Sequence, residues 1–233
     1  MKYKLLSSLY HQDKEKHNMV YEKRLDSYGT YLFPISVNKC QSFMVPDWEI
    51  ASLIESIGRK NAAAMEVFSA LPGIAKVYYM RKCLIDEIQT TNDIEGVHST
   101  RQEITTALNA ESRGKRLTRF EGMAKKYAKL FQGETLHVPL QTCKDIRNLY
   151  DEIVSNEIDA KEQPDGIIFR KSTVYVMSPT QQIRHEGVNP EEKIIEALEN
   201  ALHILEDEEL PVLVRVAAFH YFFGYIHPFY DGN

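Results

Sequence analysis

The feature that most constrains the fold is an apolar stretch at residues 210–226, interrupted by Arg215 and His220. Pro211 suits the first turn of a helix and Gly224 suits a position near its end, so the stretch predicts a buried helix. A chain of 233 residues is long enough to bury such a helix in a core.

A short polar turn follows this stretch, with the sequence His227-Pro228-Phe229-Tyr230-Asp231-Gly232-Asn233. Histidine titrates near neutral pH and can take a proton from a hydroxyl group. Aspartate is an oxygen ligand suited to Mg²⁺, and a Gly-Asn pair can turn backbone N–H groups toward an anion. A general base, a metal ligand and an anion site in one turn indicate nucleotide chemistry. The structural alternative is a helix C-terminus closed by an Asp-Gly turn.

These seven residues resemble the start of the signature of the Fic family (filamentation induced by cyclic AMP), His-Pro-Phe-x-Asp/Glu-Gly-Asn-Gly-Arg-x-x-Arg. The resemblance extends over roughly residues 74–233. It implies a mainly helical Fic-like fold with one short β-hairpin, called the flap. We expect residues 1–73 to be an N-terminal extension and residues 74–233 to be the Fic-like domain.

A second segment resembles the inhibitory motif of self-inhibited Fic proteins, Ser/Thr-x-x-x-Glu-Gly/Asn. Here it reads Thr91-Asn-Asp-Ile-Glu95-Gly96, at the end of a helix expected over residues 74–95. Ile74, Val77, Arg81, Leu84, Ile85 and Ile88 recur at helical spacing within that range. A structural reading can hold at the same time, with Gly96 as a C-cap and Ser99 or Thr100 opening the next helix in a capping box with Gln102 or Glu103.

Further helices are predicted from local signals. Asp47 is a candidate N-cap for a helix whose inward face would comprise Trp48, Ala51, Leu53, Ile54 and Ile57. Other helices are expected near 100–112, 117–132 and 143–156, the last opened by Thr142. Asn189 and Pro190 suit the N-cap and first position of a helix with Ile194, Ile195, Leu198, Leu202 and Leu205 on its apolar face.

Residues 167–177 are rich in β-branched and aromatic residues and predict a hairpin that turns near Lys171–Ser172. Its residues Phe169, Arg170, Val174 and Val176 are similar to the flap of the Fic family. A free strand edge can hold a target peptide by strand addition. The alternative is a hairpin that only covers the core.

The resemblance implies a protein adenylyltransferase that moves AMP from ATP to a Ser, Thr or Tyr hydroxyl of a target protein. His227 would deprotonate the hydroxyl, Asp231 would hold Mg²⁺, and Gly232 and Asn233 would begin the anion hole. Pro228 and Phe229 would fix the loop in the core. Glu95 would inhibit by pairing with the second arginine of the signature.

The chain stops at Asn233, before the positions of both signature arginines, and is either a fragment of a longer protein or a truncated product. We therefore expect the 233-residue chain to bind ATP weakly, to be nearly inactive, and to self-associate or recruit the missing helix from elsewhere. Self-modification at a tyrosine is a further expectation. Two alternatives remain: a non-catalytic Fic-like domain that binds a partner or nucleotide, and transfer of another phosphate-containing group.

Composition excludes several other classes. A formal net charge of −5 argues against a nucleic-acid surface. Three isolated cysteines, an odd number, fit a reducing compartment, and we expect a cytoplasmic protein. No apolar run approaches the length of a transmembrane helix.

Overall fold

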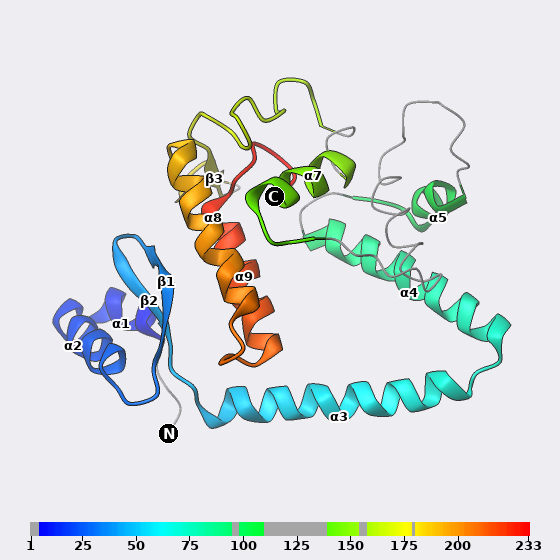
Figure 1. Ribbon diagram of the computed structural model, residues 1–233, viewed down its shortest axis with the longest axis horizontal. Coiled ribbons are helices and arrows are strands. Elements are labelled where there is room, and N and C mark those ends of the chain that lie inside the picture. The colour runs from blue at the N-terminus through cyan, green and yellow to red at the C-terminus, as the bar shows by residue number, and fades with distance from the viewer. Residues whose placement is uncertain (1–4, 95–97, 110–138, 154–157, 179) are drawn as a thin grey trace. The chain divides into compact units, whose positions relative to one another are not determined.

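The computed structural model describes residues 5–94, 98–109, 139–153, 158–178 and 180–233. In these ranges the chain forms eight helices and two antiparallel hairpins, which confirms the predicted mainly helical fold (Figure 1). The chain divides into two compact units, Met1–Ala64 and Met65–Asn233.

The first unit contains helices α1 (Leu6–Gln12) and α2 (Lys14–Leu25) and strands β1 (Tyr31–Val37) and β2 (Cys40–Met44). Asn38 and Lys39 join the strands with φ of 50° and 66°, and two left-handed residues give the turn whose twist suits a tight hairpin. Helix α2 contacts the hairpin through Tyr21, whose hydroxyl donates to the Gln41 carbonyl at 2.9 Å. The N-terminal third therefore has a hairpin of its own, in addition to the predicted one.

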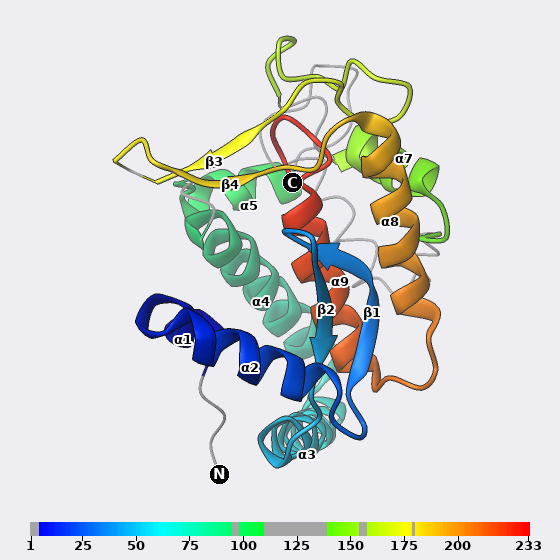
Figure 2. The same ribbon diagram turned by 90° about the vertical axis from the view of Figure 1, so that its left-hand side faces the viewer.

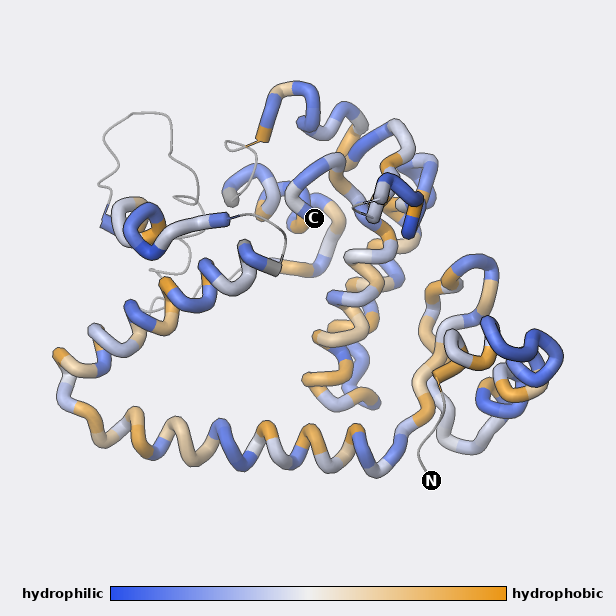
Figure 3. The backbone as a smooth tube through the Cα atoms, turned by 180° about the vertical axis from the view of Figure 1, so that it is seen from behind, coloured by the Kyte–Doolittle hydropathy of each residue, from blue (hydrophilic) through white to orange (hydrophobic). Residues whose placement is uncertain are grey.

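Helix α3 (Trp48–Ala70) begins where predicted, because Asp47 Oδ1 accepts a hydrogen bond from the Ile50 N–H at 2.9 Å. Its predicted inward face is wrong: Trp48, Leu53 and Ile57 are 89%, 57% and 49% exposed. Figure 3 shows hydrophobic and hydrophilic residues alternating along this helix. A helical period shows which side chains share a face, but it does not show that a neighbouring element covers that face.

Helix α4 (Gly73–Ile94) confirms the helix predicted over 74–95 and packs against α5 (Arg101–Asn109). Their shared core comprises Leu84, Ile85, Ile88, Ile104 and Ala107. The prediction fails at the start of α4, where Ile74 and Val77 are exposed.

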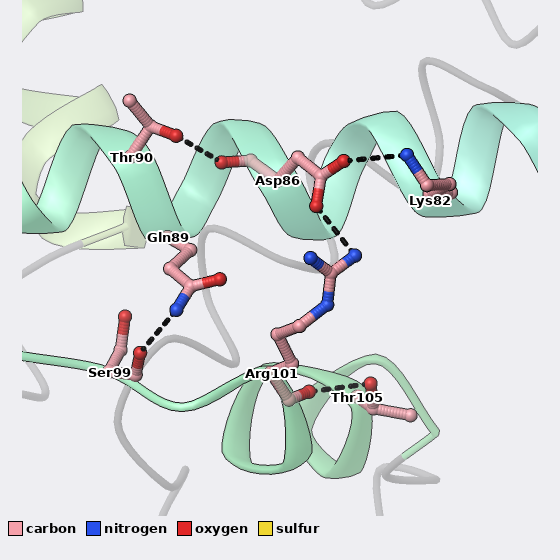
Figure 4. Close-up of polar contacts among 7 residues, drawn as sticks. All are labelled: Lys82, Asp86, Gln89, Thr90, Ser99, Arg101 and Thr105. Carbon is pink, nitrogen blue, oxygen red and sulfur yellow. Dashed lines mark hydrogen bonds and ion pairs between the residues drawn. The ribbon is translucent and has the colours of Figure 1, made fainter.

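A polar network borders the core between α4 and α5 (Figure 4). Asp86 accepts from Lys82 at 3.2 Å and from Arg101 at 2.6 Å, so one carboxylate joins the two helices. The predicted capping box is present at the start of α5: Thr100 N–H donates to Glu103 Oε2 at 2.8 Å, and Glu103 N–H donates to Thr100 Oγ1 at 3.2 Å.

Helices α7 (Cys143–Ile153), α8 (Glu191–Glu206) and α9 (Val212–Ile226) carry the C-terminal core, and α8 and α9 lie side by side (Figure 2). Thr142 caps α7 as predicted, since its Oγ1 accepts from Asp145 N–H at 3.2 Å. Most of the predicted face of α8 is buried: Ile194, Leu198 and Leu202 are at most 3% exposed. Asn189 does not cap α8, because its amide instead donates to the Lys171 carbonyl at 2.9 Å. The helix expected at 117–132 lies outside the described residues.

The expected burial of α9 is only partly correct. Phe222 and Ile226 are buried, whereas Val212, Val216 and Tyr221 are between 53% and 59% exposed. A helix that is apolar on all sides needs neighbours on all sides, and within the described residues this face of α9 remains exposed.

The second hairpin also differs from its prediction. Strands β3 (Tyr175–Met177) and β4 (Ile183–Glu186) are joined by a turn closed between Ser178 and Gln182, not near Lys171–Ser172. Val176 is in β3 and Val174 immediately precedes it, but Phe169 and Arg170 lie in the segment before the hairpin.

Candidate active site

Helix α9 ends at His227, which adopts the left-handed conformation with φ 53° and ψ 64°. Its N–H still donates to the Phe223 carbonyl at 2.9 Å. The next residue, Pro228, disfavours helical geometry at His227 and cannot donate a backbone hydrogen bond. The sequence thus ends the helix at this residue and holds the imidazole where the site loop, residues 227–233, begins.

Burial lowers the pKa of His227 below its usual 6.5, and the positive charge of Arg170 lowers it further. His185 on β4 acts in the same direction more weakly, whereas a hydrogen bond with the Gly224 backbone and the Asp231 carboxylate oppose the shift. The imidazole is therefore neutral at neutral pH, the form that can accept a proton.

We predict that the pKa of the His227 ring lies below 6.5, the usual value of an unperturbed histidine. Protonation then favours the unfolded chain, so stability should be complete above about pH 6.5 and should fall as the pH drops through the lowered folded-state pKa. NMR titration of the ring resonances measures the shift. A midpoint at or above 6.5 would contradict it.

The site loop is fixed to the core by aromatic stacking. Phe229, 1% exposed, stacks on Tyr150 of α7 with centroids 3.7 Å apart and an interplanar angle of 13°. It also meets Phe169 edge-on at 5.5 Å. Pro228 is fully buried beside it. These contacts hold the backbone between His227 and Asp231.

The loop closes on itself at Asn233. The Asn233 side chain accepts from the Phe229 N–H at 2.8 Å and donates to the Phe229 carbonyl at 3.0 Å. Gly232 has φ of 74°, which suits glycine, and its N–H donates to Asp231 Oδ1 at 2.7 Å. The side chain of Asp231 is exposed at the tip of this closed loop.

Asp231 has the oxygen chemistry that Mg²⁺ prefers, and Mg²⁺ sites commonly combine one or two carboxylates with substrate phosphates and water. Within the described ranges, no group of three His, Cys, Asp or Glu side chains could hold a metal alone. The residues therefore fit a Mg²⁺ ion that Asp231 and a nucleotide would share. The phenol of Tyr150 lies close to this carboxylate: burial and the charge of Asp231 raise its pKa to about 12.

Sequence reasoning missed the role that Arg170 has in the structure. Its fully buried guanidinium donates to the carbonyls of His227 at 2.9 Å, Ser172 at 2.7 Å and Val188 at 2.8 Å. Two of these acceptors, His227 and Val188, are 57 and 18 residues from Arg170 along the chain, so no local pattern indicates them. The Phe169-Arg170 pair was recognised in the sequence, but it was assigned to the hairpin and not to the segment that precedes it.

A second missed residue is Glu191, at the start of α8. Its carboxylate accepts backbone N–H bonds from Ile167 at 3.0 Å, Ile168 at 2.7 Å and Phe169 at 2.8 Å. Gly166 makes this approach possible, since a Cβ there would lie 2.3 Å from Glu191 Oε2. Glu191 therefore fixes the segment that carries Phe169 and Arg170.

Tyr230 links the same segment to the site loop. Its hydroxyl accepts from Ser172 N–H at 2.9 Å and donates to Asp165 Oδ1 at 2.9 Å. With Arg170 and Phe169, this makes three separate connections between residues 165–172 and the loop. Of the predicted inhibitory residues, Thr91 is exposed in the last turn of α4, and Glu95 and Gly96 lie outside the described residues.

Residues 140–233 match the family model of the Fic/DOC family. These residues belong to the Fic/DOC family. The matched range contains the hairpin, α7, α8, α9 and the whole site loop.

The fold is similar to that of a crystal structure of a Fic family protein from Desulfovibrio desulfuricans G20, with a TM-score of 0.54 at 21% sequence identity. The match covers 81% of this chain and 55% of that chain, so this chain spans about half the length of that Fic protein. The comparison with curated proteins found no match. Within the part of the chain that the structure describes, no helix has both the length and the apolar character needed to cross a bilayer.

Proposed function

We propose that this Fic domain transfers AMP from ATP to a Ser, Thr or Tyr hydroxyl of a protein. The observation that supports the proposal best is the presentation of His227. Its neutral imidazole is held at a fixed turn by the buried Pro228 and Phe229 and lies on the same loop as the exposed Asp231 carboxylate. A general base and a metal-binding carboxylate on one rigid loop suit nucleotidyl transfer.

In the proposed reaction the hydroxyl oxygen attacks the α-phosphorus of ATP. The new bond joins that oxygen to the α-phosphorus, the bond from the α-phosphorus to the β-phosphate oxygen breaks, and pyrophosphate leaves. His227 takes the hydroxyl proton. A Mg²⁺ ion held by Asp231 would neutralise phosphate charge. Gly232 and Asn233 stay predicted contributors to the anion hole, and Phe229 keeps the loop in place during the reaction.

Two labels of ATP distinguish this reaction from its alternatives. The measurement uses a chain that continues through the arginines of the signature, because the resemblance implies that they bind the β- and γ-phosphates. Label from the α-phosphate should appear on protein, and label from the γ-phosphate should not. Transfer of γ-label alone would indicate phosphoryl transfer, and transfer of neither would indicate a binding module.

The inhibitory role of Glu95 is part of the proposal. We expect Glu95→Gly to increase α-label transfer in the continued chain, because the carboxylate at this position resembles the inhibitor of the family. The sequence predicts Glu95 at a helix C-terminus, where the helix dipole disfavours a negative charge, so the cost in stability of this substitution should be modest.

The control is Glu87→Gly, which removes an exposed carboxylate from inside α4 and carries the full glycine penalty of a helix interior. Equal α-label transfer by the continued chain with and without the Glu95→Gly substitution would rule out inhibition by Glu95. An equal increase in both variants would assign the effect to loosening of α4.

A further inference from the structure

Arg170 is a fully buried cation whose contacts are all to carbonyl oxygens. In addition to His227, Ser172 and Val188, its Nη2 donates to the Ile226 carbonyl at 3.4 Å. No carboxylate of the described residues forms an ion pair with it. A buried charge without a counter-ion is costly unless hydrogen bonds satisfy it, so these carbonyls are what keeps the guanidinium in place.

The four carbonyls belong to two parts of the site. Ser172 precedes β3 and Val188 follows β4, so they lie at the two ends of the hairpin. Ile226 and His227 are at the C-terminus of α9, where helix carbonyls lack intrahelical donors and carry partial negative charge. One side chain therefore meets both ends of the hairpin and the end of the catalytic helix.

Backbone hydrogen bonds connect the same two parts, the hairpin and the C-terminus of α9. Gly187 N–H donates to the Val174 carbonyl at 3.0 Å, which closes the base of the hairpin. Val188 N–H donates to the Ile226 carbonyl at 3.0 Å, which joins that base to α9. Gly187 leaves room for the guanidinium, since a Cβ there would lie 2.5 Å from Arg170 Nη2 and 3.2 Å from His227 Cβ.

We infer that Arg170 is a positioning residue that holds the two ends of the β3–β4 hairpin in a fixed place relative to the backbone of His227. Its catalytic meaning rests on the proposed function. A target strand held on the hairpin would then present its hydroxyl at a constant distance from the imidazole. Arg170 acts through the hairpin and the site loop and contacts neither nucleotide nor target.

Amide hydrogen exchange of the 233-residue chain tests this inference without ATP. In Arg170→Met, exchange should accelerate by about tenfold or more at the amides of Gly187, Val188 and His227, because a charge-assisted hydrogen bond to their region is lost. The amide of Leu202 in α8 should keep its protection. Arg215→Met is the control, since Arg215 lies on α9 and, like Arg170, donates to a backbone carbonyl, that of Leu205 at 2.9 Å.

The pKa of the His227 ring distinguishes the effect of the charge of Arg170 from the effect of its hydrogen bonds. This pKa should rise in Arg170→Met, which removes the neighbouring cation, and should stay low in Arg170→Lys, which keeps a charge. Arg170→Lys should still accelerate exchange at the hairpin base, because an ammonium cannot reproduce the planar fork of donors. If the methionine variant does not fold, the lysine variant carries the exchange test alone.

Exchange within about twofold of the native rate at these three amides, in whichever variant folds, would overturn the inference. So would equal acceleration in Arg215→Met. Because these measurements need no transfer activity, a failure of the AMP-transfer proposal leaves them interpretable.

Discussion

Replacement of His227 by alanine is expected to lower AMP transfer by about 10²–10⁴-fold, the usual contribution of a positioned general base. The reason is that the imidazole is held neutral at the start of the site loop, where no other described histidine is presented by the turn itself. The measurement is α-label transfer in the chain that continues through the signature. Equal labelling in the variant would remove His227 from the mechanism.

Two further variants make this prediction specific. His220→Ala removes an exposed histidine from the same helix and should leave transfer unchanged. His227→Asn removes the base but suits the left-handed conformation that His227 adopts, φ 53°, which alanine does not. An asparagine variant as inactive as the alanine variant, with native stability, would assign the loss to the base and not to a distorted loop.

Replacement of Glu191 by alanine is expected to lower the free energy of unfolding by roughly 2–4 kcal/mol, since it leaves three backbone N–H groups without their acceptor. Glu191 is 7% exposed, so water replaces the carboxylate poorly. Urea unfolding measures the change. Glu192→Ala is the matched control, because Glu192 shares the first turn of α8 and the same dipole but is exposed.

The same carboxylate should make the free energy of unfolding decrease at acid pH. Burial alone would raise the pKa of Glu191, but its three backbone hydrogen bonds outweigh burial and hold the pKa below the usual 4.5. A lowered folded-state pKa contributes stability above the unfolded value, and this contribution is lost as the pH falls through the folded pKa. The acid sensitivity should therefore be smaller in Glu191→Ala. Unchanged stability in that variant at neutral pH would contradict both expectations.

Local features of this fold could be predicted from the sequence because their causes are local. Asp47, Thr100 and Thr142 each cap a helix through a backbone N–H three residues ahead, a distance that a sequence pattern covers. The end of α9 is equally local, because Pro228 immediately follows His227. The seven residues of the site loop were identified for the same reason.

Features that depend on tertiary contacts were missed or misplaced. The β-branched run at 167–177 was assigned to both strands of a hairpin, but its first half folds around Glu191, twenty or more residues away in sequence. The actual turn is closed between Ser178 and Gln182, beyond the end of that run. Apolar side chains of α3 and α9 were expected to be buried, but several are exposed. A sequence pattern does not show whether a neighbouring element covers a helix face.

The aromatic contacts of Phe229 bear on when the site forms during folding. Its two ring partners, Tyr150 and Phe169, come from α7 and from the segment before the hairpin, which are far from Phe229 along the chain. Contacts between distant segments require closure of long loops and tend to form slowly. We therefore expect the ring environment of Phe229 to become native late in refolding, after helix formation. Near-ultraviolet circular dichroism during refolding would then report the assembly of the catalytic loop itself.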